Sequence, residues 1–177
     1  MAIPFLANSE EALSPDYWIT SAEQWGHLEA GEVVLLDASK ESGGSGEGHA
    51  ATAAILIHSP IEPVWNVVND HDKAPEFIKS LIASKTIEKD TGYSILQQQV
   101  KVGFYRVNYM AELRLKPPDL IEFDQVSGDL KSMDGFWRFI SVESETGSKT
   151  LLIYRLSLKP DFPVPPFLIV CQIRSSR

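Results

Sequence analysis

Four histidines, at positions 27, 49, 58 and 71, are the first side chains to consider for chemistry. They fall in different segments without the spacing of a metal-binding motif, and no cysteine pair or carboxylate-rich loop accompanies them, so we predict no zinc or iron site. His58 follows an apolar run, and His71 lies between Asp70 and Asp72. Either can be imagined as a general base, but isolated histidines at the ends of elements are usually surface or capping groups.

Serine, glycine and cysteine also form no catalytic constellation. No Gly-x-Ser-x-Gly motif is present, so the nucleophile of an α/β-hydrolase is missing. The glycines of residues 43–48 fit neither a dinucleotide-binding motif nor a phosphate-binding loop, and a flexible linker is the simpler interpretation. Cys171 is the single cysteine and lies in the apolar run "FLIVCQI", where a small buried side chain is expected. We therefore predict no catalytic residue, no metal and no cofactor.

Aromatic and aliphatic side chains remain as candidates for binding. Several fall on strand faces that can point inward, and others can face them from helices. The simplest interpretation of each residue is core packing, but a shared apolar pocket would also explain them. Buried tyrosine hydroxyls need partners, and a ligand carbonyl can serve. The residues predicted to line this cavity are Phe77, Ile78, Tyr109, Phe123, Trp137, Phe139, Tyr154, Phe167 and Val170.

Composition is typical of a globular protein, with 177 residues, 44% hydrophobic and 23% charged. The formal net charge is −8, and residues 1–39 contain seven acidic residues but no Lys or Arg. No basic stripe could neutralise phosphates, so nucleic acid is not an expected partner. No apolar run approaches the ~18 residues of a membrane helix, and the first residues lack the features of a signal peptide. We expect a soluble protein that is cytoplasmic as the chain stands, or exported if a signal peptide has been removed.

The first 49 residues are expected to form an acidic N-terminal extension. Residues 14–29 are typical of one helix, with Ser14 as cap and Pro15 in the first turn. A strand over 31–39 and a glycine-rich connection over 40–49 follow. We place the main domain at residues 50–177.

The main domain opens with a strand over residues 51–59 and two short helices. In "SPIEPVWNVVNDHDKAPEF", Ser59 and Glu62 predict a capping box, and Asp72 predicts the cap of a second helix. Period-two patterning then predicts an antiparallel meander over 82–88, 93–102, 105–116, 120–127, 136–143 and 150–158. An apolar helix is expected from about residue 166. Burying its long apolar face requires the sheet to curl around it, which leaves an internal space in an α+β fold.

These segments carry a family resemblance. The runs "AILIHSPIEPVWNVVNDHDKAPEF", "VSGDLKSMDGFWRF" and "TLLIYRLSLKPDFPVPPFL" resemble the polyketide cyclase/dehydrase and coenzyme Q-binding (COQ10-like) branch of the START-like (SRPBCC) superfamily. The resemblance covers roughly residues 50–177 and implies a helix-grip (Bet v 1-like) fold, with a curved antiparallel sheet around a C-terminal helix that is short or truncated here. The matching residues are Pro60, Val64, Trp65, Pro75, Glu76, Phe77, Gly135, Phe136 and Trp137.

The resemblance, together with the lack of a catalytic set, implies a protein that binds or transports a hydrophobic small molecule such as a lipid, quinone, isoprenoid or polyketide-like compound without catalysis. One alternative is an enzyme of the cyclase/dehydrase kind that uses tyrosines or an arginine for acid-base work. Arg106, Arg138 and Arg155 are expected on outward faces, which argues against it. Another is a protein-interaction module that docks a partner through the acidic extension or an exposed sheet face.

Overall fold

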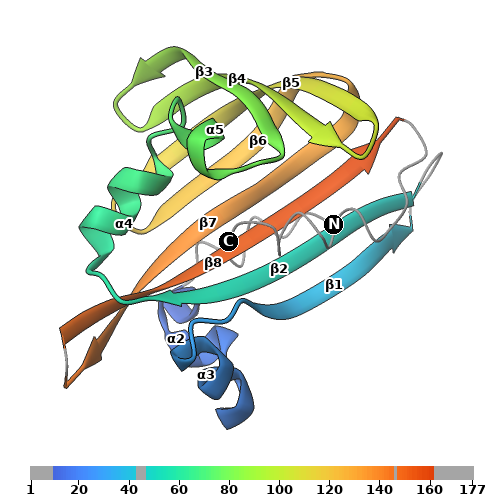
Figure 1. Ribbon diagram of the computed structural model, residues 1–177. Coiled ribbons are helices and arrows are strands. Elements are labelled where there is room, and N and C mark those ends of the chain that lie inside the picture. Colours follow the sequence, from blue (N-terminus) through green and yellow to red (C-terminus); the bar gives the residue numbers. More distant parts are fainter. Residues whose placement is uncertain (1–9, 43–46, 146, 162–177) are drawn as a thin grey trace.

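One antiparallel sheet organises the protein (Figure 1). The computed structural model describes residues 10–42, 47–145 and 147–161. Within these residues the sheet has eight strands in the order β1-β2-β8-β7-β6-β5-β4-β3, so each strand from β3 to β8 pairs with the next along the chain. The predicted meander is therefore confirmed. The strands are β1 (Val34–Ser42), β2 (Glu47–Ile57), β3 (Leu81–Asp90), β4 (Tyr93–Val102), β5 (Tyr105–Lys116), β6 (Leu120–Gly128), β7 (Leu130–Ser144) and β8 (Gly147–Pro160).

The described helices are short and lie on opposite sides of the sheet (Figure 1). The 3-10 helix η1 (Glu10–Leu13), α2 (Pro15–Trp18) and α3 (Ala22–Glu29) precede the strands, whereas α4 (Ile61–Val68) and α5 (Ala74–Phe77) connect β2 to β3. We call the side that carries α4 the concave face and the side that carries α2 and α3 the convex face. The final helix expected from residue 166, around which the sheet should curl, lies outside the described residues.

The central strands carry apolar side chains on both faces of the sheet, and both faces are covered in part by helices. In β8, Leu152 and Tyr154 point to the concave face, and Leu151 and Ile153 point to the convex face. Successive strand residues point to opposite sides, so an apolar residue at every position marks a strand buried on both faces. Leu151 and Ile153 are fully buried because the N-terminal helices pack over them.

The N-terminal helices form a lid on the convex face. The prediction of one helix over 14–29 was wrong, because the chain breaks after Trp18 and starts again at Ser21. Ser21 accepts a hydrogen bond from the Gln24 backbone, and the Gln24 side chain accepts one from the Ser21 backbone, which completes a capping box. The break turns Ile19 into the sheet, where it is buried with Leu28.

Strand β1 extends the sheet beyond the part that resembles the family. It pairs antiparallel with β2, from Val34 opposite Ala54 to Ser42 opposite Glu47. Much of the glycine-rich connection expected over 40–49 is therefore strand, since β1 ends at Ser42 and β2 begins at Glu47. The division of the chain at residue 49 remains a prediction, but the residues on its two sides share one sheet.

Helix α4 forms where a short helix was predicted, but its N-terminus differs from the prediction. Pro60 occupies the N-cap without a side-chain cap bond, so the capping box expected from Ser59 and Glu62 was wrong. Instead, the fully buried Thr150 donates a hydrogen bond of 2.8 Å from its Oγ1 to the Ser59 carbonyl and anchors the turn into the helix. Four apolar residues of α4, which are Ile61, Val64, Trp65 and Val68, pack against the concave face of the sheet. The Trp65 ring contacts Phe139 with ring centroids 5.1 Å apart.

Two further details differ from the sequence interpretation. Lys73 rather than Asp72 is the N-cap of α5, because the Asp72 carboxylate accepts hydrogen bonds from the backbone and hydroxyl of Thr86 on β3. Residues 130–135, expected to be a connection, belong to β7.

Candidate functional site

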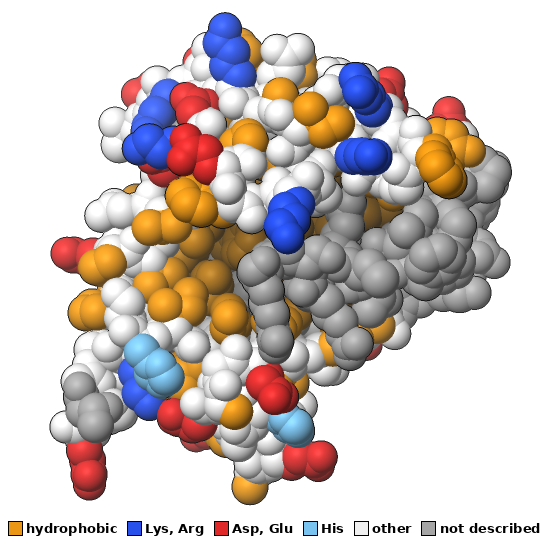
Figure 2. All heavy atoms as spheres, viewed as in Figure 1, with side chains coloured by type: hydrophobic (Ala, Val, Ile, Leu, Met, Phe, Trp, Pro, Cys, Tyr) orange, Lys and Arg blue, Asp and Glu red, His pale blue; other side chains and the backbone are white. Residues whose placement is uncertain are grey.

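The concave face carries a continuous apolar surface. Figure 2 shows hydrophobic side chains gathered in a hollow on the side of the molecule where α4 lies. The side chains come from alternate positions of β2 and β4 to β8 and from α4, so sheet pairing brings together residues that are far apart in the sequence. They include Ile55, Leu96, Tyr109, Ala111, Leu113, Ile121, Phe123, Met133, Trp137, Phe139, Leu152, Tyr154, Leu156 and Leu158.

Three aromatic rings from neighbouring strands stack on this face. Trp137 on β7 lies over Tyr154 on β8 with ring centroids 4.0 Å apart and planes 27° from parallel. Tyr154 also stacks with Phe123 on β6 at 6.2 Å. The pairing of Trp137 directly opposite Tyr154 in the β7–β8 register produces the first contact. The result is an aromatic platform, formed by Phe123, Trp137 and Tyr154, on the inner side of the sheet.

Gly135 makes room for that platform. A Cβ at this position would lie 2.5 Å from Cζ of Phe123 and would also collide with the Arg155 carbonyl. Gly135 is opposite Phe123 in the β6–β7 register, so the absent side chain lets the phenylalanine ring lie across β7. This gives a physical reason for the Gly135-Phe136-Trp137 run. Gly135 leaves room for the Phe123 ring, and Trp137 contributes the ring that stacks on Tyr154.

A chain of hydrogen bonds crosses the concave face beside the platform. The Tyr109 hydroxyl on β5 donates to Oε1 of Gln98 on β4 at 2.7 Å, and the Gln98 Nε2 donates to Oγ of Ser84 on β3 at 2.9 Å. Burial raises the pKa of Tyr109 to about 12, so its hydroxyl stays protonated at neutral pH. Gln98 and Ser84 were not among the predicted lining residues. The signal for Gln98 was its place two residues after Leu96, on the apolar side of β4.

The Tyr154 hydroxyl has a different environment. Burial raises the pKa of the Tyr154 hydroxyl well above the ordinary value, and the electrostatic effect of Tyr109 raises it further. Unlike Tyr109, Tyr154 makes no side-chain hydrogen bond to the residues that the structure describes. Its hydroxyl is therefore a protonated donor on an apolar surface and can bind an acceptor oxygen.

The other predicted lining residues divide into three groups. Phe139 is 1% exposed and belongs to the core beneath the hollow, against Trp65. Phe77 is 65% exposed and Ile78 is half-buried; the structure does not bring either into the apolar cluster of the concave face. Phe167 and Val170 lie outside the described residues.

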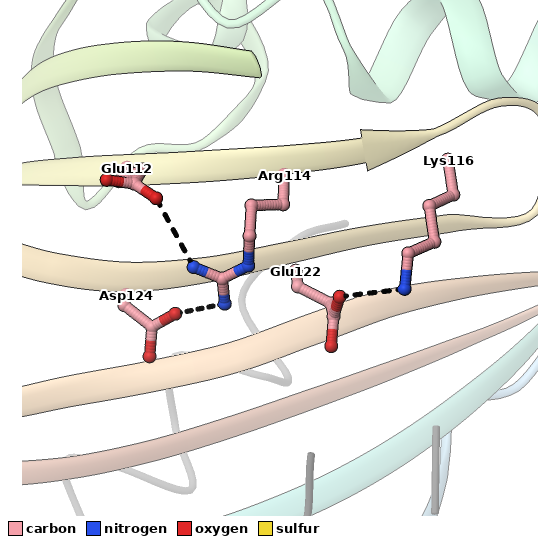
Figure 3. A network of polar contacts seen from close by, with 5 residues as sticks. All are labelled: Glu112, Arg114, Lys116, Glu122 and Asp124. Carbon is pink, nitrogen blue, oxygen red and sulfur yellow. Dashed lines mark hydrogen bonds and ion pairs between the residues drawn. The ribbon is translucent and has the colours of Figure 1, made fainter. Parts of the chain in front are cut away.

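Charged side chains gather on the convex face instead. Figure 3 shows Arg114 between Glu112 and Asp124, and Lys116 paired with Glu122 at 3.3 Å. These residues alternate along β5 and β6 with the apolar residues of the concave face, so they point away from the hollow. The network links two strands across the convex surface, on the side of the sheet opposite to the aromatic platform.

Two arginines on the convex face are buried. Arg138 is 4% exposed and lies between Phe136 and Ile140, and desolvation lowers its pKa. Arg155 is 8% exposed and donates to the Thr52 hydroxyl at 3.0 Å. Both side chains lie on the outer face of the sheet, as predicted. Their burial was not predicted, because the sequence does not show that the N-terminal helices cover this face. Neither guanidinium reaches the hollow.

A second, polar depression lies beside α4 and α5. Burial lowers the pKa of His71 to about 4, so its ring is neutral at pH 7, and its buried Nε2 has no hydrogen-bond partner within the part of the chain described. His58, by contrast, is exposed and lies 3.8 Å from Glu29. In the same part of the chain, no three His, Cys, Asp or Glu side chains are grouped to hold a metal. The depression is lined by Asn66, Asn69, Asp70, His71, Asp72, Thr86 and Lys89.

Comparison with known proteins gives a family match and a fold match. A family model described as polyketide cyclase / dehydrase and lipid transport matches residues 57–174. No protein of curated function matches the sequence. Among the described helices, none is long and apolar enough to cross a membrane.

Three solved structures illustrate the fold. The Zhui aromatase/cyclase from Streptomyces sp. R1128 is similar with a TM-score of 0.62 at 14% identity, over 73% of this chain and 86% of that chain. A START superfamily protein from Mycobacterium smegmatis has a TM-score of 0.60 at 13% identity, over 72% and 92%. A STAR-related lipid transfer protein from Xanthomonas axonopodis has a TM-score of 0.55 at 12% identity, over 78% and 97%. At these identities the likeness shows the helix-grip, START-like fold alone.

Proposed function

Because the chain belongs to the polyketide cyclase/dehydrase and lipid transport family, we propose that it binds a hydrophobic small molecule against the concave face of its sheet, without catalysis. The ligand class is a lipid, quinone, isoprenoid or polyketide-like compound. One observation carries the proposal: the platform of Phe123, Trp137 and Tyr154 carries a tyrosine hydroxyl that no described residue engages.

The geometry supports binding in two ways. Apolar pockets that hold small molecules usually combine a hydrophobic lining with a few polar groups that set orientation. Here the lining is the concave cluster, and the polar groups are the Tyr154 hydroxyl and the bonded set of Tyr109, Gln98 and Ser84. We expect the ligand to lie against the platform, with one of its oxygen atoms accepting a hydrogen bond from the Tyr154 hydroxyl.

Two features support binding without catalysis. Tyr109 and Tyr154 both have raised pKa values, so at neutral pH they are hydrogen-bond donors and not bases. The buried arginines point to the convex face, which leaves no described guanidinium beside the platform to polarise a carbonyl.

Finer assignments belong to the same proposal. Phe77, Ile78, Phe167 and Val170 remain proposed lining residues that would meet the ligand from outside the sheet. The coenzyme Q-binding (COQ10-like) branch remains the proposed position within the superfamily, and it makes a quinone the first ligand to test.

An enzyme of the cyclase/dehydrase kind is the second candidate. The presence of both Tyr109 and Tyr154 on the concave face favours it, because two phenols beside one ligand can act as paired acids. The two candidates differ in what happens to the bound compound. A binding protein returns it unchanged, whereas an enzyme releases a product of different mass or unsaturation.

The experiment is extraction of the purified protein with organic solvent followed by mass spectrometry, with native mass spectrometry of the same sample. We expect a stoichiometric apolar compound, and its re-addition to stripped protein should raise the melting temperature. Recovery of the same compound after prolonged incubation supports binding alone. An empty protein whose melting temperature no lipid, quinone or isoprenoid shifts would refute the proposal.

A further inference from the structure

The hairpin between β4 and β5 ends in an exposed aromatic residue. Val102 pairs with Tyr105, so Gly103 and Phe104 form a two-residue turn, and Gly103 has a positive φ of 60°. Turns of this length with a left-handed glycine match the twist of the flanking strands. Phe104 is 103% exposed and Tyr105 is 48% exposed. The tip is therefore a short hairpin turn with a fully exposed phenylalanine ring at its apex.

The charge around this tip is opposite in sign to that of the whole chain. The chain has a net charge of −8, yet residues 91–111 contain no Asp or Glu, and Lys101 and Arg106 flank the turn. The Lys101 backbone donates to the Ser80 carbonyl at 2.7 Å, which brings Lys79 to the same end of the sheet. All three cations belong to exposed residues. An acid, Asp129, also contacts β5, where its carboxylate accepts two hydrogen bonds from Asn108.

We propose that this hairpin tip docks on an anionic lipid bilayer. Phe104 enters the boundary between headgroups and acyl chains, while Lys79, Lys101 and Arg106 lie against anionic headgroups. Aromatic and basic side chains together are the combination that binds such interfaces, through apolar burial and attraction to the negative surface. A bilayer fits the tip better than a protein does, because a single ring at the apex of a narrow hairpin offers little of the broad surface that a stable protein interface buries.

This inference does not depend on a ligand at the concave face, since the tip and its charges are independent of the aromatic platform. It is also compatible with the absence of a membrane-crossing helix among the described residues, because interfacial docking requires only a few side chains.

The test is flotation of the full chain with vesicles of phosphatidylcholine alone and with vesicles that also contain phosphatidylserine. We expect binding to the vesicles that contain phosphatidylserine, and this binding should weaken at high salt.

Phe104→Glu should reduce the partition coefficient by about tenfold or more, because it replaces the inserting ring with a charge. Lys101→Gln with Arg106→Gln should reduce it by roughly tenfold as well. Val67→Glu on α4, at a residue that is 67% exposed, is the matched control and should bind like the unmodified protein.

Melting temperatures confirm that each variant is folded. The proposal is overturned if the unmodified chain does not float with anionic vesicles, or if Phe104→Glu binds them as well as Val67→Glu does. It is also overturned if sedimentation shows a dimer that Phe104→Glu dissociates while vesicle binding is unchanged, because the tip would then be an interface between two copies of the chain.

Discussion

Tyr109 and Tyr154 show how the same residue type takes two roles on one face. Tyr109 has its hydrogen bond within the protein, through Gln98, whereas the Tyr154 hydroxyl makes none to the described residues. A hydrogen bond within the protein typically contributes about 1 kcal/mol to stability, a contribution that the Tyr154 hydroxyl does not receive from the described residues. The two tyrosines can therefore be separated by their response to the same substitution.

We predict that Tyr109→Phe lowers the free energy of unfolding by about 1 kcal/mol, because it leaves the Gln98 carbonyl oxygen without its donor. Tyr154→Phe should leave that free energy nearly unchanged while it weakens the binding of an oxygen-bearing apolar ligand. Urea denaturation and ligand titration of the two variants measure both effects. Equal losses of stability would show that Tyr154 has a structural partner and would remove the basis for its role as a ligand donor.

His71 makes stability depend on pH. Burial lowers its pKa from the ordinary value of 6.5 to about 4 in the folded protein. Between these values the unfolded chain binds a proton at His71 that the folded chain does not bind, so stability falls as the pH is lowered through this window. The full effect is about 3 kcal/mol. We predict a steeper loss of stability between pH 6.5 and pH 4 than in His71→Asn, measured by urea denaturation across this range; parallel curves would contradict it.

At the scale of elements, β7 shows how one missing side chain positions a neighbour. Gly135 leaves the space that the Phe123 ring occupies, and Trp137, two residues later on the same face, stacks on Tyr154. The convex side of the same strand carries Phe136, which packs with Leu28 and the rest of the N-terminal lid. Strand β7 therefore connects the lid and the concave face.

We predict that Gly135→Ala destabilises the protein by about 1–3 kcal/mol, because the added methyl group forces either Phe123 or the adjacent strand to move. Gly26→Ala is the matched control, since Gly26 lies inside α3 and an added Cβ there would have nothing within 4 Å. The control should gain about 0.5–1 kcal/mol from reduced backbone freedom. Thermal unfolding compares the two, and a neutral Gly135→Ala would contradict the close approach of Phe123.

At the scale of the whole molecule, one sheet separates two chemically different sides. The concave side is apolar, with a few neutral hydrogen-bonding groups, and the convex side carries the lid over β2, β7 and β8 and the charged network on β5 and β6. The lid allows the central strands to be apolar on both faces. The hairpin tip projects from an end of this sheet, where β4 turns into β5.

Local sequence patterns predicted the strands well. The features that were not predicted depend on contacts between residues far apart in the sequence. Alternation predicted β5 over 105–116, as found, because one of its faces is uniformly apolar. The break at Thr20, the buried Arg155 and the bond from Tyr109 to Gln98 all depend on which strands and helices meet. No local pattern contains that information. Phe123, Trp137 and Tyr154 were each predicted to line a cavity, but their stacking on one another follows from the registers of β6, β7 and β8.

The most direct measurement is titration of the protein with a fluorescent fatty acid or quinone analogue that displaces bound ligand. Leu156→Trp, which enlarges a side chain on the concave face, should weaken binding by about tenfold or more while the protein stays folded. Ile87→Trp, at a residue that is 49% exposed on the edge strand β3, should bind like the unmodified protein. Equal binding by both variants would contradict a ligand site on the concave face.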